Sequence, residues 1–434
     1  MVPDGASAGY GRPVHICNGG SMATVTSPER VTRAGLVVAA VICASVVVSH
    51  MFGRFSYSLL LPAISDDLVD SFTGAGFLGA SYFAGYLLGV VGVTAVSSRV
   101  EPLTLLRTGL GLSALALLVL ATAVRFSVLA SGVFFAGLAG AGIWIPAPTI
   151  ATAGLPARHR GLVMGALTAS MGAGLLLISQ GTTLYRAVVD DDGAWRPIFG
   201  VEATLTVFVF AAAVFFVKVP SSTTAVVERT PLFDLDGLRS IPQWVKLTAA
   251  YTIFAVLAGS WTQFLGVAME EDAGFGRAHI NNLYSVLAIA GIPGPLIFGR
   301  ISDRVGRDQA IALACTVAGL ASLLVTLGRE PFVTIAAALY GAGSFAVPPL
   351  TAAAVRDHLE GRAFAAAFGA MTIVYATASM IAAQLAGVLA DASGSFDPVY
   401  QLLTVGAIAA GGFAELRRRG ARAVNETAHE RSPR

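Results

Sequence analysis

The chain has 434 residues, of which 55% are hydrophobic and 12% are charged, and its mean hydropathy is +0.72. Soluble domains carry about 25% charged residues, so this composition excludes an ordinary soluble domain and predicts an integral membrane protein. The net charge of +2 is too small to indicate a nucleic-acid partner. The three cysteines are odd in number and widely spaced, which argues against a disulfide framework or a metal site.

The first segment, residues 1–33, is rich in Gly, Ser and Pro. It lacks the basic start and the apolar core of a signal peptide. We therefore expect a disordered cytoplasmic tail, with Met22 as an alternative natural start.

Long apolar runs follow this segment. A helix needs about 20 apolar residues to cross a bilayer, and the runs predict an all-α protein with twelve spanning helices. Pro62, Pro220 and Pro331 are expected to mark helix ends. The twelve spans are expected at residues 34–62, 72–96, 103–124, 126–150, 161–185, 196–217, 244–268, 279–301, 309–328, 332–355, 362–390 and 397–415.

The longest connection, residues 218–243, divides the spans into two groups of six. A faint repeat supports this division, because residues 156–161 and 356–362 are similar basic segments about 200 residues apart. Two repeated halves with a site between them at the midplane are typical of transporters. We expect a six-helix bundle at 34–217, a cytoplasmic loop at 218–243, a second bundle at 244–415 and a basic cytoplasmic tail at 416–434.

The distribution of charge predicts the orientation. With both termini in the cytoplasm, most of the 28 Lys and Arg residues fall on the cytoplasmic side, as the positive-inside rule requires. The outer loops are instead acidic, at residues 66–70, 190–192 and 270–272. We therefore expect a multi-pass protein of the cytoplasmic (inner) membrane.

A charged motif between the eighth and ninth spans carries a family resemblance. Five of its residues match the pattern G-x-x-x-D-R-x-G-R, namely Gly299, Asp303, Arg304, Gly306 and Arg307. In this respect the chain resembles the major facilitator superfamily (MFS) of solute transporters. The resemblance implies two pseudo-symmetric six-helix bundles and a cytoplasmic gate at these residues, where the aspartate pairs with an arginine and a helix end. The alternative is a solvated charged loop, and the related loop at residues 96–102 lacks the aspartate.

Three further segments refine the resemblance. Residues 53–62 and 76–89 resemble the YbfB/YjiJ-type branch of the superfamily, which favours export. Residues 386–396 are similar to the end of the eleventh helix in monocarboxylate and oxalate-type carriers and in many other members. Residues 133–137 lack the arginine and glutamine of the R-x-x-Q-G pattern of drug/proton antiporters, which argues against the proton relay of those antiporters.

Arg54 is the strongest candidate for contact with the substrate. An arginine within a spanning helix costs at least about 2.5–3.5 kcal/mol on insertion scales, so it normally faces a cavity or a partner. Its planar fork suits a carboxylate or a phosphate. His50, Arg54 and Tyr57 have the α-helical spacing i, i+4, i+7, which places them on one face. The alternatives are that Arg54 snorkels to the outer surface or pairs with an acidic side chain.

Other polar and aromatic residues fall within the predicted spans. In the superfamily, helices 1, 4, 7 and 10 line the cavity and helices 2, 5, 8 and 11 flank it. A role in the aromatic belt or in helix contacts is the alternative for each residue. The candidates for substrate binding besides Arg54 are Tyr57, Tyr82, Trp144, Trp261, Gln263, Tyr284, Tyr340 and Tyr375.

Two residues are candidates for proton coupling. Glu202 is an acid within the sixth span, and His50 has a suitable intrinsic pKa. Glu202 could instead be wet near the outer surface, and His50 could be a buried neutral side chain. Gly85 and Gly89 form a small-x-x-x-small pair, which predicts close helix packing.

The expected function is secondary active transport of a small organic solute by alternating access. Arg54 favours an organic anion such as a monocarboxylate, and protons are candidate coupling ions. No nucleotide-binding loop, enzymatic constellation or metal cluster is visible in the sequence, and we expect no cofactor and a monomer. The alternative is a non-transporting membrane sensor on the same scaffold.

Overall fold

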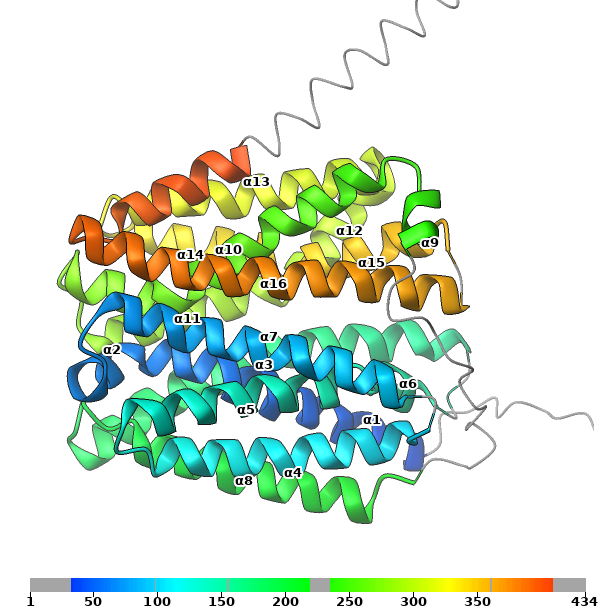
Figure 1. Cartoon of the computed structure of the whole chain (residues 1–434), viewed down its shortest axis with the longest axis horizontal. Coiled ribbons are helices and arrows are strands. Elements are labelled where there is room, and N and C mark those ends of the chain that lie inside the picture. Colours follow the sequence, from blue (N-terminus) through cyan, green and yellow to red (C-terminus); the bar gives the residue numbers. More distant parts are fainter. Residues whose placement is uncertain are drawn as a thin grey trace, which may run out of the picture.

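The computed structural model describes residues 33–97, 99–153, 155, 157–218, 235–359 and 361–408. These residues form helices joined by short turns, and no strand occurs among them. The helices lie roughly parallel to one axis (Figure 1). The predicted tail at 416–434 and nearly all of the tail at 1–33 lie outside the described residues.

The N-terminal half forms the first six spans. Three consecutive helices make the first span, which includes a π-helix, and two helices make the fourth. In chain order the helices are α1 (Arg33–Val46), η1 (Val47–Ser56), α2 (Tyr57–Leu68), α3 (Phe72–Val96), α4 (Pro102–Ala121), α5 (Phe126–Trp144), α6 (Ala147–Thr152), α7 (Ala157–Val189) and α8 (Arg196–Phe215).

The C-terminal half begins with a short helix, which lies within the predicted central loop. Two of its spans are each built from two helices. In chain order the helices are α9 (Leu235–Ser240), α10 (Trp244–Glu271), α11 (Arg277–Gly291), α12 (Gly294–Val305), α13 (Arg307–Val325), α14 (Phe332–Ser344), α15 (Val347–Arg356) and α16 (Gly361–Ser393).

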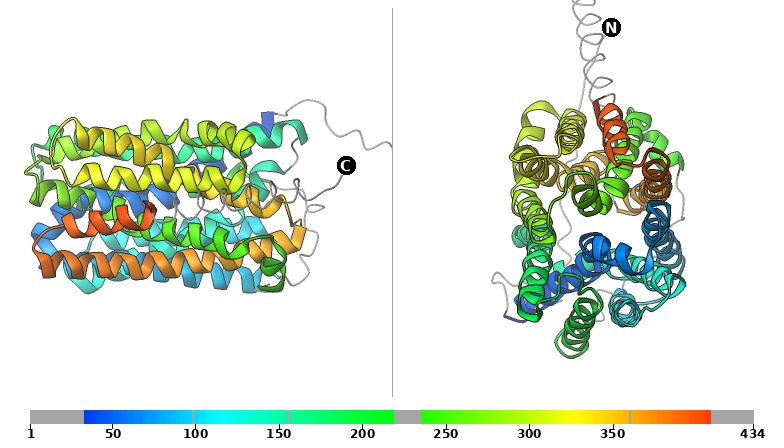
Figure 2. Two further views of the ribbon diagram at one scale, coloured as in Figure 1. Left: turned by 90° about the horizontal axis from the view of Figure 1, so that it is seen from above. Right: turned by 90° about the vertical axis from the view of Figure 1, so that its left-hand side faces the viewer.

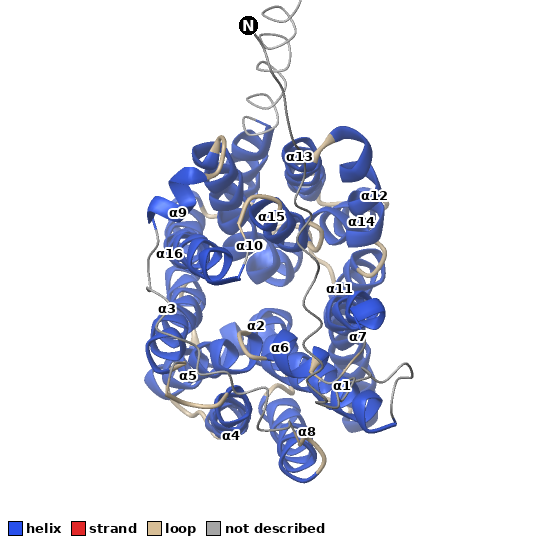
Figure 3. Cartoon of the chain, turned by 90° about the vertical axis from the view of Figure 1, so that its right-hand side faces the viewer, coloured by secondary structure: helices blue, strands red, loops and turns tan. Residues whose placement is uncertain are grey.

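Eleven spans in the described part of the chain are long and apolar enough to cross a membrane. Residues 397–408, the described part of the predicted twelfth span, are also helical. Seen along the helices, the two halves form two groups that face each other (Figures 2 and 3). This architecture confirms the predicted all-α membrane fold.

The first span is longer than predicted. Pro62 was expected to end it but lies inside α2, which continues to Leu68. A proline removes one backbone hydrogen bond, which a packed membrane helix can tolerate. The ring of Pro62 packs against Gly266 of α10, where a Cβ atom would lie 3.1 Å from it. The contact with the other half therefore holds this stretch of helix in place.

Interruptions divide three spans that were predicted as single helices. The fourth and tenth spans break near Pro146 and Ala346, and the eighth breaks near Pro293. Proline is favourable in the first turn of a helix but cannot donate to the preceding turn. The breaks in the fourth and tenth spans occupy similar places in the two halves.

Glycines let α3 and α5 approach closely within the N-terminal half. A Cβ atom at Gly85 would overlap the carbonyl oxygen of Phe134, and one at Gly89 would lie 2.7 Å from that of Leu138. In membranes, close approach of this kind is a main source of helix association. The close packing predicted for this glycine pair is present.

We therefore expect Gly85→Ala to lower the thermal unfolding midpoint of the detergent-solubilised protein. Overpacking costs about 1–3 kcal/mol. For a domain the size of one half of this chain, this corresponds to a fall of about 3–10 °C in the unfolding midpoint. Gly92→Ala in the same helix is the matched control, because no other atom lies within 4 Å of its Cβ position. Equal midpoints for the two variants would contradict this account.

Candidate functional site

Arg54 lies in η1, near the middle of the first span. Its Nη2 donates a hydrogen bond of 2.7 Å to the carbonyl oxygen of Ala258, which lies near the middle of α10. The guanidinium therefore reaches across from one half to the other at mid-depth. This position excludes the alternative in which Arg54 snorkels to the outer surface.

Aromatic rings cover the guanidinium of Arg54. Its Cζ lies 4.9 Å from the centroid of the Phe83 ring and 5.2 Å from that of Phe55. Such contacts partly compensate a cation for lost hydration. Within the described part of the chain, no Asp or Glu forms an ion pair with Arg54, and the side chain remains partly exposed. The site therefore carries a positive charge without a neutralising carboxylate.

Three tyrosines lie near this charge. They are Tyr82 of α3, Tyr340 of α14 and Tyr375 of α16. The hydroxyl group of Tyr340 donates to the carbonyl oxygen of Leu257 at 3.4 Å, and the ring of Tyr375 lies 6.3 Å from that of Phe83. The hydroxyl group of Tyr82 is buried and has no hydrogen-bond partner in the structure. Buried polar groups are normally paired, and this hydroxyl lies against Gly140 of α5, where a Cβ atom would be 3.3 Å from it.

His50 and Trp144 form a neighbouring group within the N-terminal half. Their ring centroids lie 5.0 Å apart, and His50 also contacts Tyr86 edge-on at 6.3 Å. The Nδ1 of His50 lies 3.0 Å from the hydroxyl oxygen of Ser49. The i, i+4, i+7 spacing assumed for His50 and Arg54 does not apply here, because residues of a π-helix hydrogen-bond to i+5.

Four other candidates are buried side chains, of which Gln263 contacts the other half and Trp261 and Tyr284 make their contacts within the C-terminal half. Tyr57 and Gln263 both donate to the carbonyl oxygen of Ala75, at 3.1 and 3.0 Å. Tyr284 donates to Thr262 within its own half. These side chains, and Trp261, which stacks on Tyr340 at 3.8 Å, are all buried.

Glu202 is buried in α8, where the residue is 4% exposed. Its Oε1 accepts a hydrogen bond from Ser56 at the end of η1, and its Oε2 has no partner in the structure. Neither Arg54 nor Arg107 of α4, which binds carbonyl groups near the end of α8, forms an ion pair with it. Glu202 is thus a buried carboxyl group next to the helix that carries Arg54.

Polar contacts join the two halves at one end of the molecule, which we call the Asp66 end. Arg277 of α11 forms an ion pair with Asp66 of α2 and hydrogen-bonds at 3.1 Å to the carbonyl oxygen of Asp192. Asp391 of α16 accepts hydrogen bonds from the backbone N–H groups of Phe72 and Thr73, at 2.9 and 2.7 Å. A carboxylate at a helix N-terminus is stabilising, so these contacts hold this end closed.

The predicted gate motif lies at the opposite end, which we call the Asp303 end. It was expected to be a loop, but Gly299 and Asp303 lie in α12 and Arg307 begins α13. Gly306 is the single residue between the two helices. Its φ of 96° is a conformation that favours glycine, and it interrupts the helical backbone at this point. Asp303 and Arg304 are exposed.

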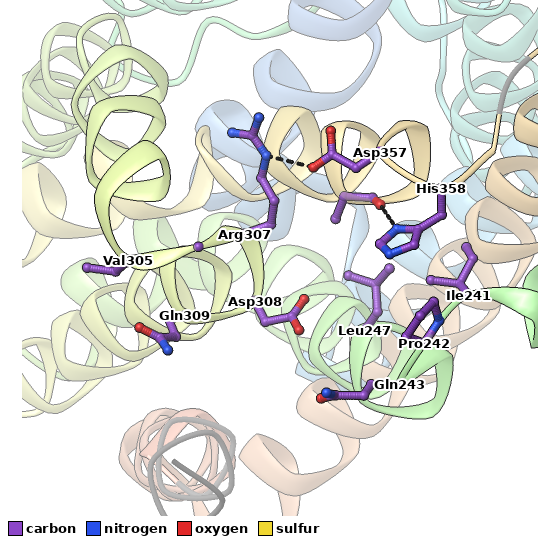
Figure 4. A pocket seen from close by; sticks show the side chains of 12 residues that line it. Ile241, Pro242, Gln243, Leu247, Val305, Arg307, Asp308, Gln309, Asp357 and His358 are labelled. Carbon is purple, nitrogen blue, oxygen red and sulfur yellow. Dashed lines mark hydrogen bonds and ion pairs between the residues drawn. The ribbon is translucent and has the colours of Figure 1, made fainter. Parts of the chain in front are cut away.

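Arg307 binds within its own half. Its Nε donates to Asp357 at 3.1 Å, and its Nη1 donates to Ser302 at 3.0 Å. Figure 4 shows Arg307 and Asp357 at a cavity of about 360 Å³ between the start of α10, the α12–α13 turn and the end of α15. His358 lines the same cavity and lies 3.1 Å from the carbonyl oxygen of Ala354.

The hydrogen bonds and ion pairs that we find between the halves lie at the Asp66 end or at mid-depth. Two glycines of α16 show the difference between the ends. A Cβ atom added at Gly387 would overlap the carbonyl oxygen of Phe72, whereas a Cβ atom added at Gly369 would have no other atom within 4 Å. The described helices therefore pack tightly at the Asp66 end and separate toward the Asp303 end.

Comparison with protein families decides the class of this fold. The family model of the Major Facilitator Superfamily matches residues 43–383. The chain belongs to the Major Facilitator Superfamily. A comparison with curated proteins finds no match. Membership of this superfamily makes the chain a secondary transporter. Transporters built from two repeated halves bind their substrates at the interface of the halves, near the membrane midplane.

Sequence reasoning missed two residues beside Arg54 and two that join the halves at the Asp66 end. Phe55 and Phe83 flank the guanidinium, but phenylalanine is common in membrane helices and gives no signal by itself. Arg277 and Asp391 join the halves, and each follows or precedes a long apolar run, where charged residues are ordinary. Their partners lie far away in the sequence, so their role becomes visible only in the fold.

We expect Arg277→Gln to loosen the Asp66 end. The readout is the rate of maleimide labelling at Ala288→Cys, a buried position of α11, in a variant without native cysteines. Loss of a partly exposed ion pair worth about 1 kcal/mol should raise this rate about fivefold. Arg196→Gln is the control, because Arg196 binds Asp67 within one half at 2.5 Å. A similar increase in both variants would mean that the contact between the halves has no special role.

Proposed function

We propose that the protein transports a small organic anion, such as a monocarboxylate, by alternating access. The observation that carries this proposal is the guanidinium of Arg54, which lies at mid-depth between the halves without a carboxylate partner. An uncompensated cation is costly within a membrane. A bound anion would supply the missing charge, and the planar fork of arginine suits a carboxylate.

The packing supports a rocking cycle between two openings. The halves are joined at the Asp66 end, so Arg54 would exchange its ligand through the Asp303 end in this conformation. In the opposite conformation, contacts such as Arg277 with Asp66 would break and the gate motif around Asp303 would close the other end. We propose that the Asp303 end and both termini are cytoplasmic, because most Lys and Arg residues lie on that side. The branch resemblance favours export.

We propose proton coupling through Glu202. Burying an unpaired carboxylate is costly, so this group is suited to binding a proton. Its partner Ser56 is two residues from Arg54 on η1, and a change of charge at Glu202 would act on the helix that holds the anion site. His50 is the second candidate, because its ring lies beside Tyr86 and the partly exposed Trp144.

Arg54→Gln should reduce counterflow of labelled monocarboxylates in proteoliposomes. We would measure lactate and benzoate, and we expect a loss of roughly 10- to 100-fold, as for a charge-assisted hydrogen bond of about 1.5–3 kcal/mol. Arg125→Gln is the matched control, because Arg125 is exposed at the start of α5. Transport of either anion at the wild-type rate by Arg54→Gln would disprove the proposed role of Arg54.

Glu202→Gln should uncouple transport from the proton gradient. The amide retains the contact with Ser56 but cannot bind and release a proton at neutral pH. We therefore expect that a pH gradient no longer accelerates flux, while counterflow at equal pH on both sides is retained. Glu101→Gln, at the exposed start of α4, serves as the control. An unchanged response to the pH gradient in Glu202→Gln would exclude this residue as the coupling group.

A further inference from the structure

A row of aromatic rings leads from the Asp303 end to Arg54. Phe364 and Phe368 of α16 are stacked, with centroids 5.7 Å apart and planes at 8°. Phe368 contacts Tyr251 of α10 at 6.3 Å, and Tyr251 contacts Tyr375 at 5.3 Å. Tyr375 in turn lies 6.3 Å from Phe83, the ring that covers Arg54. The rings therefore connect the open side of the molecule with the charge at its middle.

The rings that α16 contributes to this row are only partly buried. Phe364, Phe368 and Tyr375 are partly exposed, whereas Tyr251 of α10 behind them is buried. Phe364 and Phe368 lie just before Gly369, on the stretch of α16 that has separated from the N-terminal half, and Tyr375 lies between Gly369 and the tight contact at Gly387. Buried rows of aromatic rings are commonly part of a hydrophobic core. This row has accessible ring surface beside the guanidinium of Arg54, so one ligand can pack against a ring and bind the charge at the same time.

The charge balance limits the ligand to one negative group. Among the described Lys and Arg residues, Arg54 is the one at mid-depth, and the others lie in the end turns of helices or in the connections. The guanidinium of Arg54 can bind one carboxylate through two parallel hydrogen bonds. A second charged group would have to lie against the rings of Tyr375 and Phe83, where an unpaired charge is costly.

We propose that the transported anion is an aromatic monocarboxylate, whose carboxylate binds Arg54 and whose ring packs against Tyr375 and Phe368. This inference rests on the proposed transport of an organic anion and names its substrate class. Rings prefer offset or edge-to-face contacts with other rings over contacts with aliphatic groups of similar size. The row would therefore select a flat ring over a puckered one with the same charge.

The test compares benzoate with cyclohexanecarboxylate, which has the same charge and number of carbon atoms but a puckered ring. Binding to the purified full-length protein would be measured by isothermal titration calorimetry. We expect wild type to bind benzoate about 3- to 10-fold more tightly. In Phe368→Leu and Tyr375→Leu this preference should fall to about one, whereas Phe208→Leu on the exposed face of α8 should retain it.

Further variants separate the two proposals. Tyr375→Phe keeps the ring and should keep the preference, which guards against a general loss of folding in Tyr375→Leu. Arg54→Gln should weaken both carboxylates alike. Equal binding of benzoate and cyclohexanecarboxylate that still depends on Arg54 would overturn the aromatic selectivity alone. Binding that does not depend on Arg54, or no binding of either anion, would overturn the anion site as well.

Discussion

The central constraint on this protein is a positive charge that must be accommodated at the middle of a membrane. Arg54 has no carboxylate partner among the described residues, so its guanidinium is held by the carbonyl oxygen of Ala258 and two ring faces. These groups come from both halves of the molecule. Contacts to this charge therefore join the two halves at mid-depth, and they include no carboxylate among the described residues.

The contacts that surround this charge differ in strength from one end to the other. At the Asp66 end, an ion pair of Arg277 and the capping of α3 by Asp391 join the halves. Both are polar contacts at helix ends, each worth about 1 kcal/mol, so they can break and re-form during a transport cycle. Large apolar surfaces lie within each half, as between α3 and α5, and the halves also pack against each other along α3 and α16 and along α7 and α11.

The irregular part of the first span carries the candidate site. Residues 47–56 form a π-helix, which occurs often at functional sites, and it carries both His50 and Arg54. Its end contacts Glu202 through Ser56. A proton at Glu202 and an anion at Arg54 would therefore act on the same short segment, which is the physical route for the coupling that we propose.

The sequence by itself determined the class of the protein. Apolar runs long enough to span a bilayer predict the number of helices and most of their positions, because the bilayer sets one length for every span. Arg54 and Glu202 were also recognisable, since an ionisable residue is conspicuous in an apolar run. The helix ends were less certain, as the continuation of α2 beyond Pro62 shows.

Only the tertiary structure decided which side chains meet. Tyr82, Tyr340 and Tyr375 come from three distant helices and lie near Arg54. Tyr57 and Gln263 instead bind the backbone of α3, and Tyr284 binds that of α10, although all of these were candidates in the sequence. The π-helix changed the register that an α-helical spacing predicts. Hydropathy reports whether a residue lies within the membrane, but its neighbours depend on the packing of helices that are far apart along the chain.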